Sequence, residues 1–181
     1  ERVRRIHSKV RGHAEDGRAY SADDPALLTW VHVTEAWGFL AGYRRFAGRV
    51  DRPDADRYYD EGRRIAEALG ARGVPRSEAE VDDYFRAVRP TLAFTGRSRE
   101  VLGVLEAMRL PVPLPGLSRD VFLGAGASLL PDWAETDLRR TPAQRLHATA
   151  SARALATIAP LFRMALDDGP SARARRRVSA D

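Results

Sequence analysis

The stretch that decides the fold is residues 24–48, which read DPALLTWVHVTEAWGFLAGYRRFAG. Asp24 followed by Pro25 is typical of a helix start, because the carboxylate accepts hydrogen bonds from free N–H groups and proline suits the first turn. Between residues 26 and 42 the only charged residue is Glu35, and apolar side chains occur all round the predicted helix. A soluble helix with this pattern is central and buried. We therefore predict one long, central helix over this stretch.

The rest of the sequence also reads as helix. Apolar residues recur at helical spacing, and several segments carry end signals such as the capping-box pair Ser77 and Glu80 or the terminal Gly70. No segment shows a convincing strand pattern; we expect a loop over residues 13–21 and a turn over residues 131–133. The sequence thus predicts an all-α fold, a single compact multi-helix domain around the central helix, with helices at 1–13, 25–48, 54–70, 77–88, 97–108, 119–130 and 141–168.

Length and composition indicate one globular domain. The chain has 181 residues, of which 44% are apolar and 30% charged, an ordinary globular mixture. It contains no cysteine, which excludes disulfide scaffolds, thiolate metal sites and cysteine nucleophiles. We expect residues 1–168 to form the domain and residues 169–181 to be a disordered basic tail. Because the chain opens at Glu1 rather than Met, we also expect its N-terminal part to be missing.

The charge pattern and the apolar runs narrow the classes of partner. The net charge is +5, but the excess of basic residues gathers at the two ends and forms no broad footprint for nucleic acid. No apolar run approaches the roughly 20 residues of a transmembrane helix, and no signal-peptide pattern is present. We therefore predict a cytoplasmic protein without a nucleic-acid partner; its oligomeric state is left open.

Common catalytic motifs are absent. The sequence contains no G-x-S-x-G, no H-E-x-x-H, no P-loop and no G-x-G-x-x-G that opens a helix. The pair Gly124 and Gly126 lacks both the preceding strand and the third glycine of a dinucleotide site. Hydrolase and nucleotide-binding functions are therefore not indicated.

His32 is the most informative residue for chemistry. It lies in the middle of the predicted central helix, and its helical neighbours Leu28, Ala36 and Phe39 are apolar. A buried imidazole needs a partner, which is a carboxylate, a backbone carbonyl or a metal. His32 is thus either a core histidine with an ordinary hydrogen bond or an axial ligand of a cofactor iron. Glu35, alone in this apolar stretch, needs an arginine partner or belongs to a site.

The first predicted helix carries a polar face. Arg4, His7, Ser8 and Arg11 follow one another at helical spacing, which places them on one side. The face is either a solvated basic surface or a polar cluster at a pocket. In a pocket, Arg4 would neutralise a carboxylate or propionate, and His7 would stand opposite the buried histidine.

These segments together resemble one known family. The resemblance covers nearly the whole chain up to Asp168, and residues 24–34 are its most specific part. The proteins in question are the haem-dependent rubber oxygenases (latex clearing proteins), the MpaB-type oxygenases and their actinobacterial relatives. They are longer at the N-terminus, so the chain resembles their C-terminal two-thirds. The similar segments are Arg4-Arg-Ile-His7, Val10-Arg-Gly12, Gly17-Arg-Ala-Tyr20, Ala22, Asp24-Pro25, Leu28-Thr-Trp-Val-His-Val-Thr34, Asp56-Arg-Tyr-Tyr-Asp-Glu61, Ala68-Leu-Gly70, and Leu129-Leu-Pro131 with Trp133.

The resemblance implies a haem b-dependent oxygenase with a haem pocket between its helices. His32 matches the iron-binding histidine of the family and is expected to ligate the iron. Arg4, His7 and Ser8 match the distal Arg-x-x-Lys-Thr pattern, with His7 in place of the lysine. Arg4 and His7 are expected to be catalytic, and Arg4 and Ser8 to bind the haem. The implied reactants are dioxygen and a small apolar, unsaturated substrate, for which isoprenoid chains are the family's example; apolar walls are expected around Leu28, Trp37 and Phe39.

A non-enzymatic protein is the alternative. It would be an all-helical ligand-binding or interaction domain in which His32 is a satisfied core residue. This alternative accounts for the apolar helices but leaves the match over residues 24–34 unexplained. The visible spectrum of the purified protein separates the two hypotheses.

Overall fold

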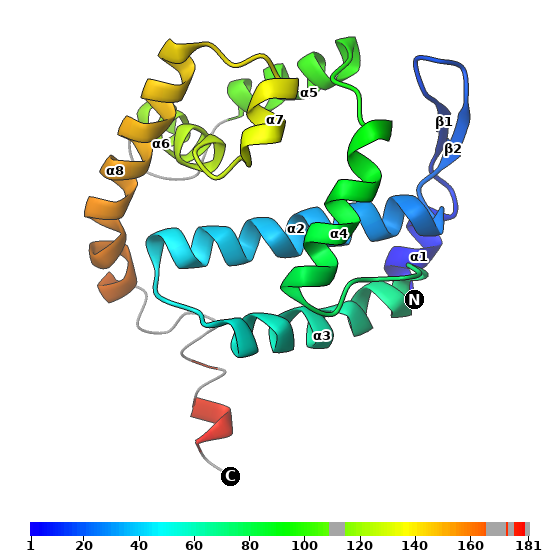
Figure 1. The fold of residues 1–181 in the computed structure, drawn as a ribbon, viewed down its shortest axis with the longest axis horizontal. Helices are drawn as coiled ribbons and strands as arrows, with labels where there is room; N and C mark the ends of the chain where they lie inside the picture. The colour runs from blue at the N-terminus through cyan, green and yellow to red at the C-terminus, as the bar shows by residue number, and fades with distance from the viewer. Residues whose placement is uncertain (109–114, 166–172, 174–175, 180–181) are drawn as a thin grey trace.

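The computed structural model describes residues 1–108, 115–165, 173 and 176–179; the side chains of 115, 116 and 161–165 lie outside the description. The described part is helical apart from one short hairpin, which confirms the predicted all-α class (Figure 1). The expected tail at 169–181 falls mostly outside the described residues and stays a prediction. The helices are α1 (Arg2–His7), α2 (Pro25–Phe46), α3 (Arg52–Leu69), α4 (Glu78–Val88), α5 (Gly96–Ala107), α6 (Pro115–Ala127), α7 (Asp132–Asp137) and α8 (Pro142–Ala165), with a 3-10 turn η1 (Arg89–Thr91) after α4.

Side-chain caps define the helix ends that position the site. The Asp24 carboxylate accepts hydrogen bonds from the backbone N–H groups of Ala26 at 2.8 Å and Leu27 at 3.2 Å, as the sequence predicts for the start of α2. The Ser77 hydroxyl accepts from the N–H of Glu80 at 3.2 Å at the start of α4. Helix α3 ends at Gly70, whose φ of +115° favours glycine.

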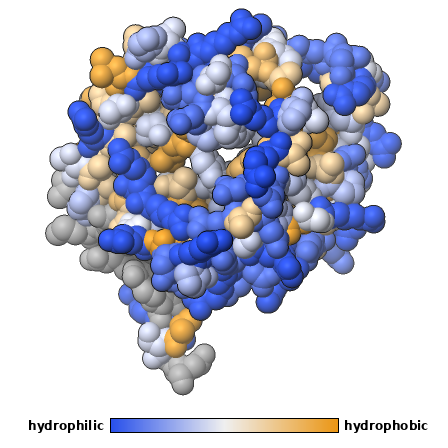
Figure 2. Space-filling model, viewed as in Figure 1, coloured by the Kyte–Doolittle hydropathy of each residue, from blue (hydrophilic) through white to orange (hydrophobic). Residues whose placement is uncertain are grey.

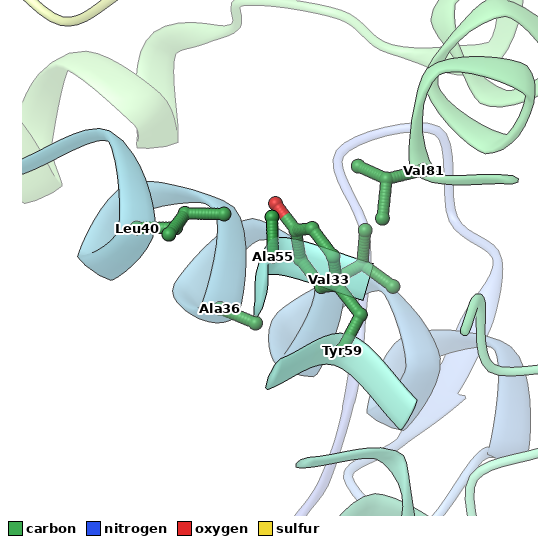
Figure 3. Packing of buried hydrophobic residues seen from close by; sticks show 6 residues of the cluster. All are labelled: Val33, Ala36, Leu40, Ala55, Tyr59 and Val81. Atoms are coloured by element: carbon green, nitrogen blue, oxygen red, sulfur yellow. The ribbon is translucent and has the colours of Figure 1, made fainter. Parts of the chain in front are cut away.

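The main core lies where α2, α3 and α4 meet. Six buried side chains fill it, with Tyr59 as the largest (Figure 3). On α2 the buried positions follow helical spacing, so a single stripe of this helix faces the core. Burying each of the larger side chains in this core stabilises the fold by about 1.5–3 kcal/mol. The six are Val33, Ala36, Leu40, Ala55, Tyr59 and Val81.

A second layer is formed by α6 and α8, which pack closely along their length. Figure 1 shows them crossing near one end of α2, and α8 contacts α2. Gly124 of α6 lies directly against Ser151 of α8, where a Cβ atom would come within 2.3 Å of the Ser151 hydroxyl oxygen. This glycine therefore permits the close approach of the two helices.

The structure corrects the N-terminal predictions. Helix α1 ends at His7, and the last residues of the predicted helix over 1–13 form the strand β1 (Arg11–His13) instead. The predicted loop contains the antiparallel partner strand β2 (Ala19–Ser21). The connection turns through Gly17, which has a φ of +82°. Strands of three residues are too short to show an alternating pattern. Arg11 is therefore in a strand, and the expected helical face stops at Ser8.

Two further expectations need correction. The predicted turn at 131–133 is the start of the short helix α7, which Asp132 and Glu135 favour as acidic residues in the first turn. The central helix is only partly buried: the side chain of Val31 is 58% exposed and that of Phe39 is 65% exposed. Apolar residues surround α2, but only the stripe facing α3 and α4 is fully covered.

Candidate functional site

His32 lies beside the core stripe of α2, on a neighbouring side of the helix. Leu28, Glu35 and Phe39 share that side, because they lie four residues before, three after and seven after the histidine. The imidazole is half-buried and points its Nε2–Cε1 edge at Gly62 of α3. A Cβ atom at position 62 would lie 3.8 Å from both of these ring atoms. The ring therefore lies close to the α3 backbone, with room at position 62 for a side chain no larger than that of alanine.

The imidazole of His32 has the protonation state of a metal ligand. Burial lowers the pKa of His32, and the carboxylate of Glu35 acts in the opposite direction. Since the ordinary pKa is 6.5, the ring is neutral at pH 7 and carries a lone pair on one nitrogen. Within the described residues no group hydrogen-bonds to the ring. The partner expected for an ordinary core histidine is therefore not found there.

Glu35 has a different environment from the one expected. Its side chain is exposed, and no arginine pairs with it in the part of the chain that the structure describes. The carboxylate acts on His32 and also on Tyr58, whose pKa is raised by burial first and by Glu35 second. Tyr58 donates a hydrogen bond to the carbonyl oxygen of Ala36 at 3.2 Å. Glu35, His32 and Tyr58 therefore form one polar group on the α2–α3 side of the histidine.

Apolar side chains flank this polar group and face outward. Phe39 of α2 is 65% exposed, and Ile65 of α3, three residues beyond Gly62, is 68% exposed. Val31, next to the histidine, is also exposed. Large apolar side chains exposed in a contiguous group mark a binding or interaction surface more often than a solvated one. We call these three exposed side chains, which lie on the segments of α2 and α3 around His32 and Gly62, the open apolar face.

Trp37 does not belong to this face, contrary to the expected apolar wall. It lies on the far side of α2, where its ring contacts Phe85 edge-on with the centroids 5.9 Å apart. Trp133 of α7 joins the same aromatic cluster through Phe85. Leu28 packs instead against a small buried cluster at the end of α3. Of the three predicted wall residues, Leu28 and Phe39 lie on the side of α2 that carries His32, and only Phe39 belongs to the open apolar face.

His7 is the most unusual of the N-terminal candidates. Its Nδ1 atom is buried and has no hydrogen-bond partner among the described residues, which is costly unless a missing group satisfies it. His7 lies close enough to Asp23 to help lower the pKa of that carboxyl, although the hydrogen bond from Ser21 is the main cause. A hydrogen bond of 2.9 Å from the Ala22 N–H to the Val10 carbonyl ties this region to the start of α2.

The other two N-terminal candidates are exposed. Arg4 forms no ion pair within the described residues, and the Ser8 hydroxyl donates to the carbonyl of Arg5 at 3.1 Å. Figure 1 shows α1 at the end of the α2–α3 pair where α2 begins, which is also the end nearer His32. No described contact joins Arg4, His7 or Ser8 to His32, so the site they were expected to share stays a prediction.

Gly62 is the site residue that sequence reasoning missed. Its signal is a glycine inside an otherwise amphipathic helix, between Tyr58 and Ile65. An interior glycine disfavours a helix by about 0.5–1 kcal/mol relative to alanine, so its presence calls for a reason. Its proximity to the His32 ring is visible only once α2 and α3 are placed side by side.

Three comparisons with known proteins bear on this site. No curated protein and no solved structure matches the chain. Among the described residues no helix is both long and apolar enough to cross a membrane. The chain does match the family described as "ER-bound oxygenase mpaB/B'/Rubber oxygenase, catalytic domain" over residues 1–160. That match spans most of the 181 residues and confirms the resemblance seen in the sequence, so the chain belongs to this family of oxygenase catalytic domains.

Proposed function

We propose that the chain is a haem b-dependent oxygenase domain in which His32 ligates the iron and dioxygen reacts with an apolar, unsaturated substrate. Membership of the oxygenase family supports the reaction class. The observation that carries the rest is the environment of His32: a neutral, half-buried imidazole with no hydrogen-bond partner among the described residues, resting on a glycine.

The residues around His32 fit a flat, largely apolar prosthetic group. Within the described residues, no three His, Asp or Glu side chains converge on one point. A single imidazole binds iron firmly only when the remaining ligands come from a group such as a porphyrin. The exposed side chains of Phe39 and Ile65 offer the apolar surface that a macrocycle would cover. Gly62 leaves the space that a larger side chain would take from the histidine ring.

Haem, when bound, supplies the redox chemistry with dioxygen. The chain's own residues hold the haem and supply the polar and apolar groups around it. His32 holds the group through its neutral nitrogen, and the nearby Glu35 carboxylate favours a ring that keeps its other proton. Phe39 and Ile65 would lie against the apolar face of the haem and keep water from that face. The Nδ1 of His7, which has no hydrogen-bond partner among the described residues, offers a hydrogen-bonding group, and the positive charge of Arg4 can pair with a propionate or another anion.

Oxygen consumption tests the proposal. The chain, supplied with one equivalent of haem b, is given a long-chain alkene in an oxygen electrode. We expect consumption that requires both haem and alkene, and that is lost in His32→Ala but kept in His147→Ala, an exposed histidine on α8. Oxygen consumption that is the same with and without the alkene would contradict the proposed substrate class. No haem binding and no consumption would favour the alternative, a non-enzymatic ligand-binding or interaction domain.

A further inference from the structure

A second candidate site lies away from His32, in an open cavity between α5, α6 and α7. Its volume is about 700 Å³, within the range of pockets that hold small molecules. Figure 2 shows apolar patches mainly over the upper half of the drawn face, where Figure 1 has α5 to α8. None of the lining residues belongs to α2 or α3. Those described are Phe94, Arg97, Ser98, Val101, Leu102, Phe122, Leu123, Gly126, Ala127, Leu130 and Leu138.

The walls of this cavity are apolar and open to solvent. Val101 is 59% exposed, Leu102 44% and Phe122 41%. Side chains of this kind favour an alkyl chain, because covering apolar surface stabilises the complex by roughly 25 cal/mol per Å². The Ser98 hydroxyl is already engaged with Thr95 at the start of α5. Among the described lining residues, the polar chemistry of the cavity therefore depends on Arg97.

Arg97 is the single charged residue in the described lining, which contains no carboxylate. Its guanidinium donates one hydrogen bond, of 2.6 Å, to the carbonyl oxygen of His13 in the hairpin. No carboxylate in the described part of the chain forms an ion pair with it. A guanidinium has five N–H donors, so several stay available to an anion. The nearby Glu15 carboxylate accepts instead from the backbone N–H of Arg97 at 2.7 Å.

We infer that this cavity binds a free, single-chain carboxylic acid of the fatty-acid type. The alkyl chain lies against Val101, Leu102 and Phe122, and the carboxylate pairs with the guanidinium of Arg97. Charge complementarity selects the ligand: among the described lining residues there is one positive charge and no negative one. Arginine suits a carboxylate because its planar fork can donate two parallel hydrogen bonds. Binding here does not depend on haem or on His32.

Calorimetric titration with three ligands of one chain length tests the inference. Dodecanoate, dodecanol and dodecyltrimethylammonium are titrated into the full chain below their micelle concentrations. We expect dodecanoate to bind at least about tenfold more tightly than dodecanol, since a charge-assisted pair adds to the apolar contact. Arg97→Gln should remove that preference and leave dodecanol binding unchanged. Arg153→Gln, an exposed arginine on α8, should change neither.

Two further variants sharpen the test. Val101→Asp should weaken dodecanoate and dodecanol alike, because it places a charge in the apolar wall. Glu15→Gln should strengthen dodecanoate binding by removing a negative charge from the neighbourhood of Arg97. Equal affinity for all three ligands, or an Arg97→Gln variant that keeps the preference, would overturn the inference. So would binding to anionic phospholipid vesicles without any binding of monomeric dodecanoate. Circular dichroism checks that each variant keeps its helical fold.

Discussion

One methyl group added to Gly124 should force α6 and α8 apart. The new Cβ atom would lie 2.3 Å from the Ser151 hydroxyl oxygen, 2.7 Å from Ser151 Cβ and 3.2 Å from His147 Nε2. A new rotamer of Ser151 relieves the first contact but not the second, so the backbones must move. Overpacking of this kind costs about 1–3 kcal/mol. We therefore expect Gly124→Ala to lower the free energy of unfolding by that amount.

Gly126 is a matched control two residues further along α6. A Cβ atom there would meet nothing within 4 Å, so Gly126→Ala should stabilise the helix by about 0.5–1 kcal/mol. Urea denaturation followed by circular dichroism should then separate the two variants by roughly 1.5–4 kcal/mol. Ser151→Gly removes the opposing atoms and should make Gly124→Ala tolerable, as a double-mutant cycle would show. A Gly124→Ala variant as stable as Gly126→Ala would refute the close crossing of α6 and α8.

Three other outcomes follow. Asp24→Ala removes the cap of α2 and should lower the free energy of unfolding by about 1 kcal/mol; urea denaturation with no change would place the start of α2 elsewhere. Burial lowers the pKa of His32, so as the pH falls the unfolded chain binds a proton at this histidine before the folded chain does. The haem-free protein should therefore lose stability as the pH falls below about 6.5. His32→Gln should lose this part of the pH dependence, and an unchanged stability profile would contradict the buried, neutral ring. Arg4→Ala should slow oxygen consumption while keeping the haem. His7→Ala should shift the absorption spectrum if the imidazole reaches the iron. If both variants behave like the parent, the face of α1 that carries Arg4 and His7 is a solvated surface.

Local signals in the sequence predicted most helix ends correctly. Each of these signals acts within one turn of the chain, so the neighbouring residues are enough to predict the helix end. Examples are the Asp24 carboxylate, the Ser77 hydroxyl and the positive φ of Gly70. The hairpin at residues 11–21 was not predicted, because its strands are too short to show a periodic pattern. The burial of α2 was overestimated, since apolar residues surround the helix and the sequence does not say which stripe meets a neighbour.

The candidate site was predictable only in part. His32 stood out as a lone imidazole in an apolar helix, and its role as the iron ligand stays a prediction. Its contact with Gly62 joins residues thirty positions apart and depends on how α2 and α3 pack. For the same reason the sequence did not show that Trp37 packs against Phe85 rather than beside His32. The cavity beside Arg97 was not predicted at all, because it forms where α5, α6 and α7 meet.

The most direct test of the account is a haem titration that follows the Soret absorbance of the parent chain, His32→Ala and His147→Ala. The account predicts saturation near one haem b per chain for the parent and for His147→Ala, and loss of the histidine-ligated spectrum in His32→Ala. Bound haem should also raise the stability of the parent to urea, since a ligand that binds the folded state stabilises it by mass action. A parent that binds no haem, or a His32→Ala variant with an unchanged Soret band, would contradict the assignment of His32 as the iron ligand.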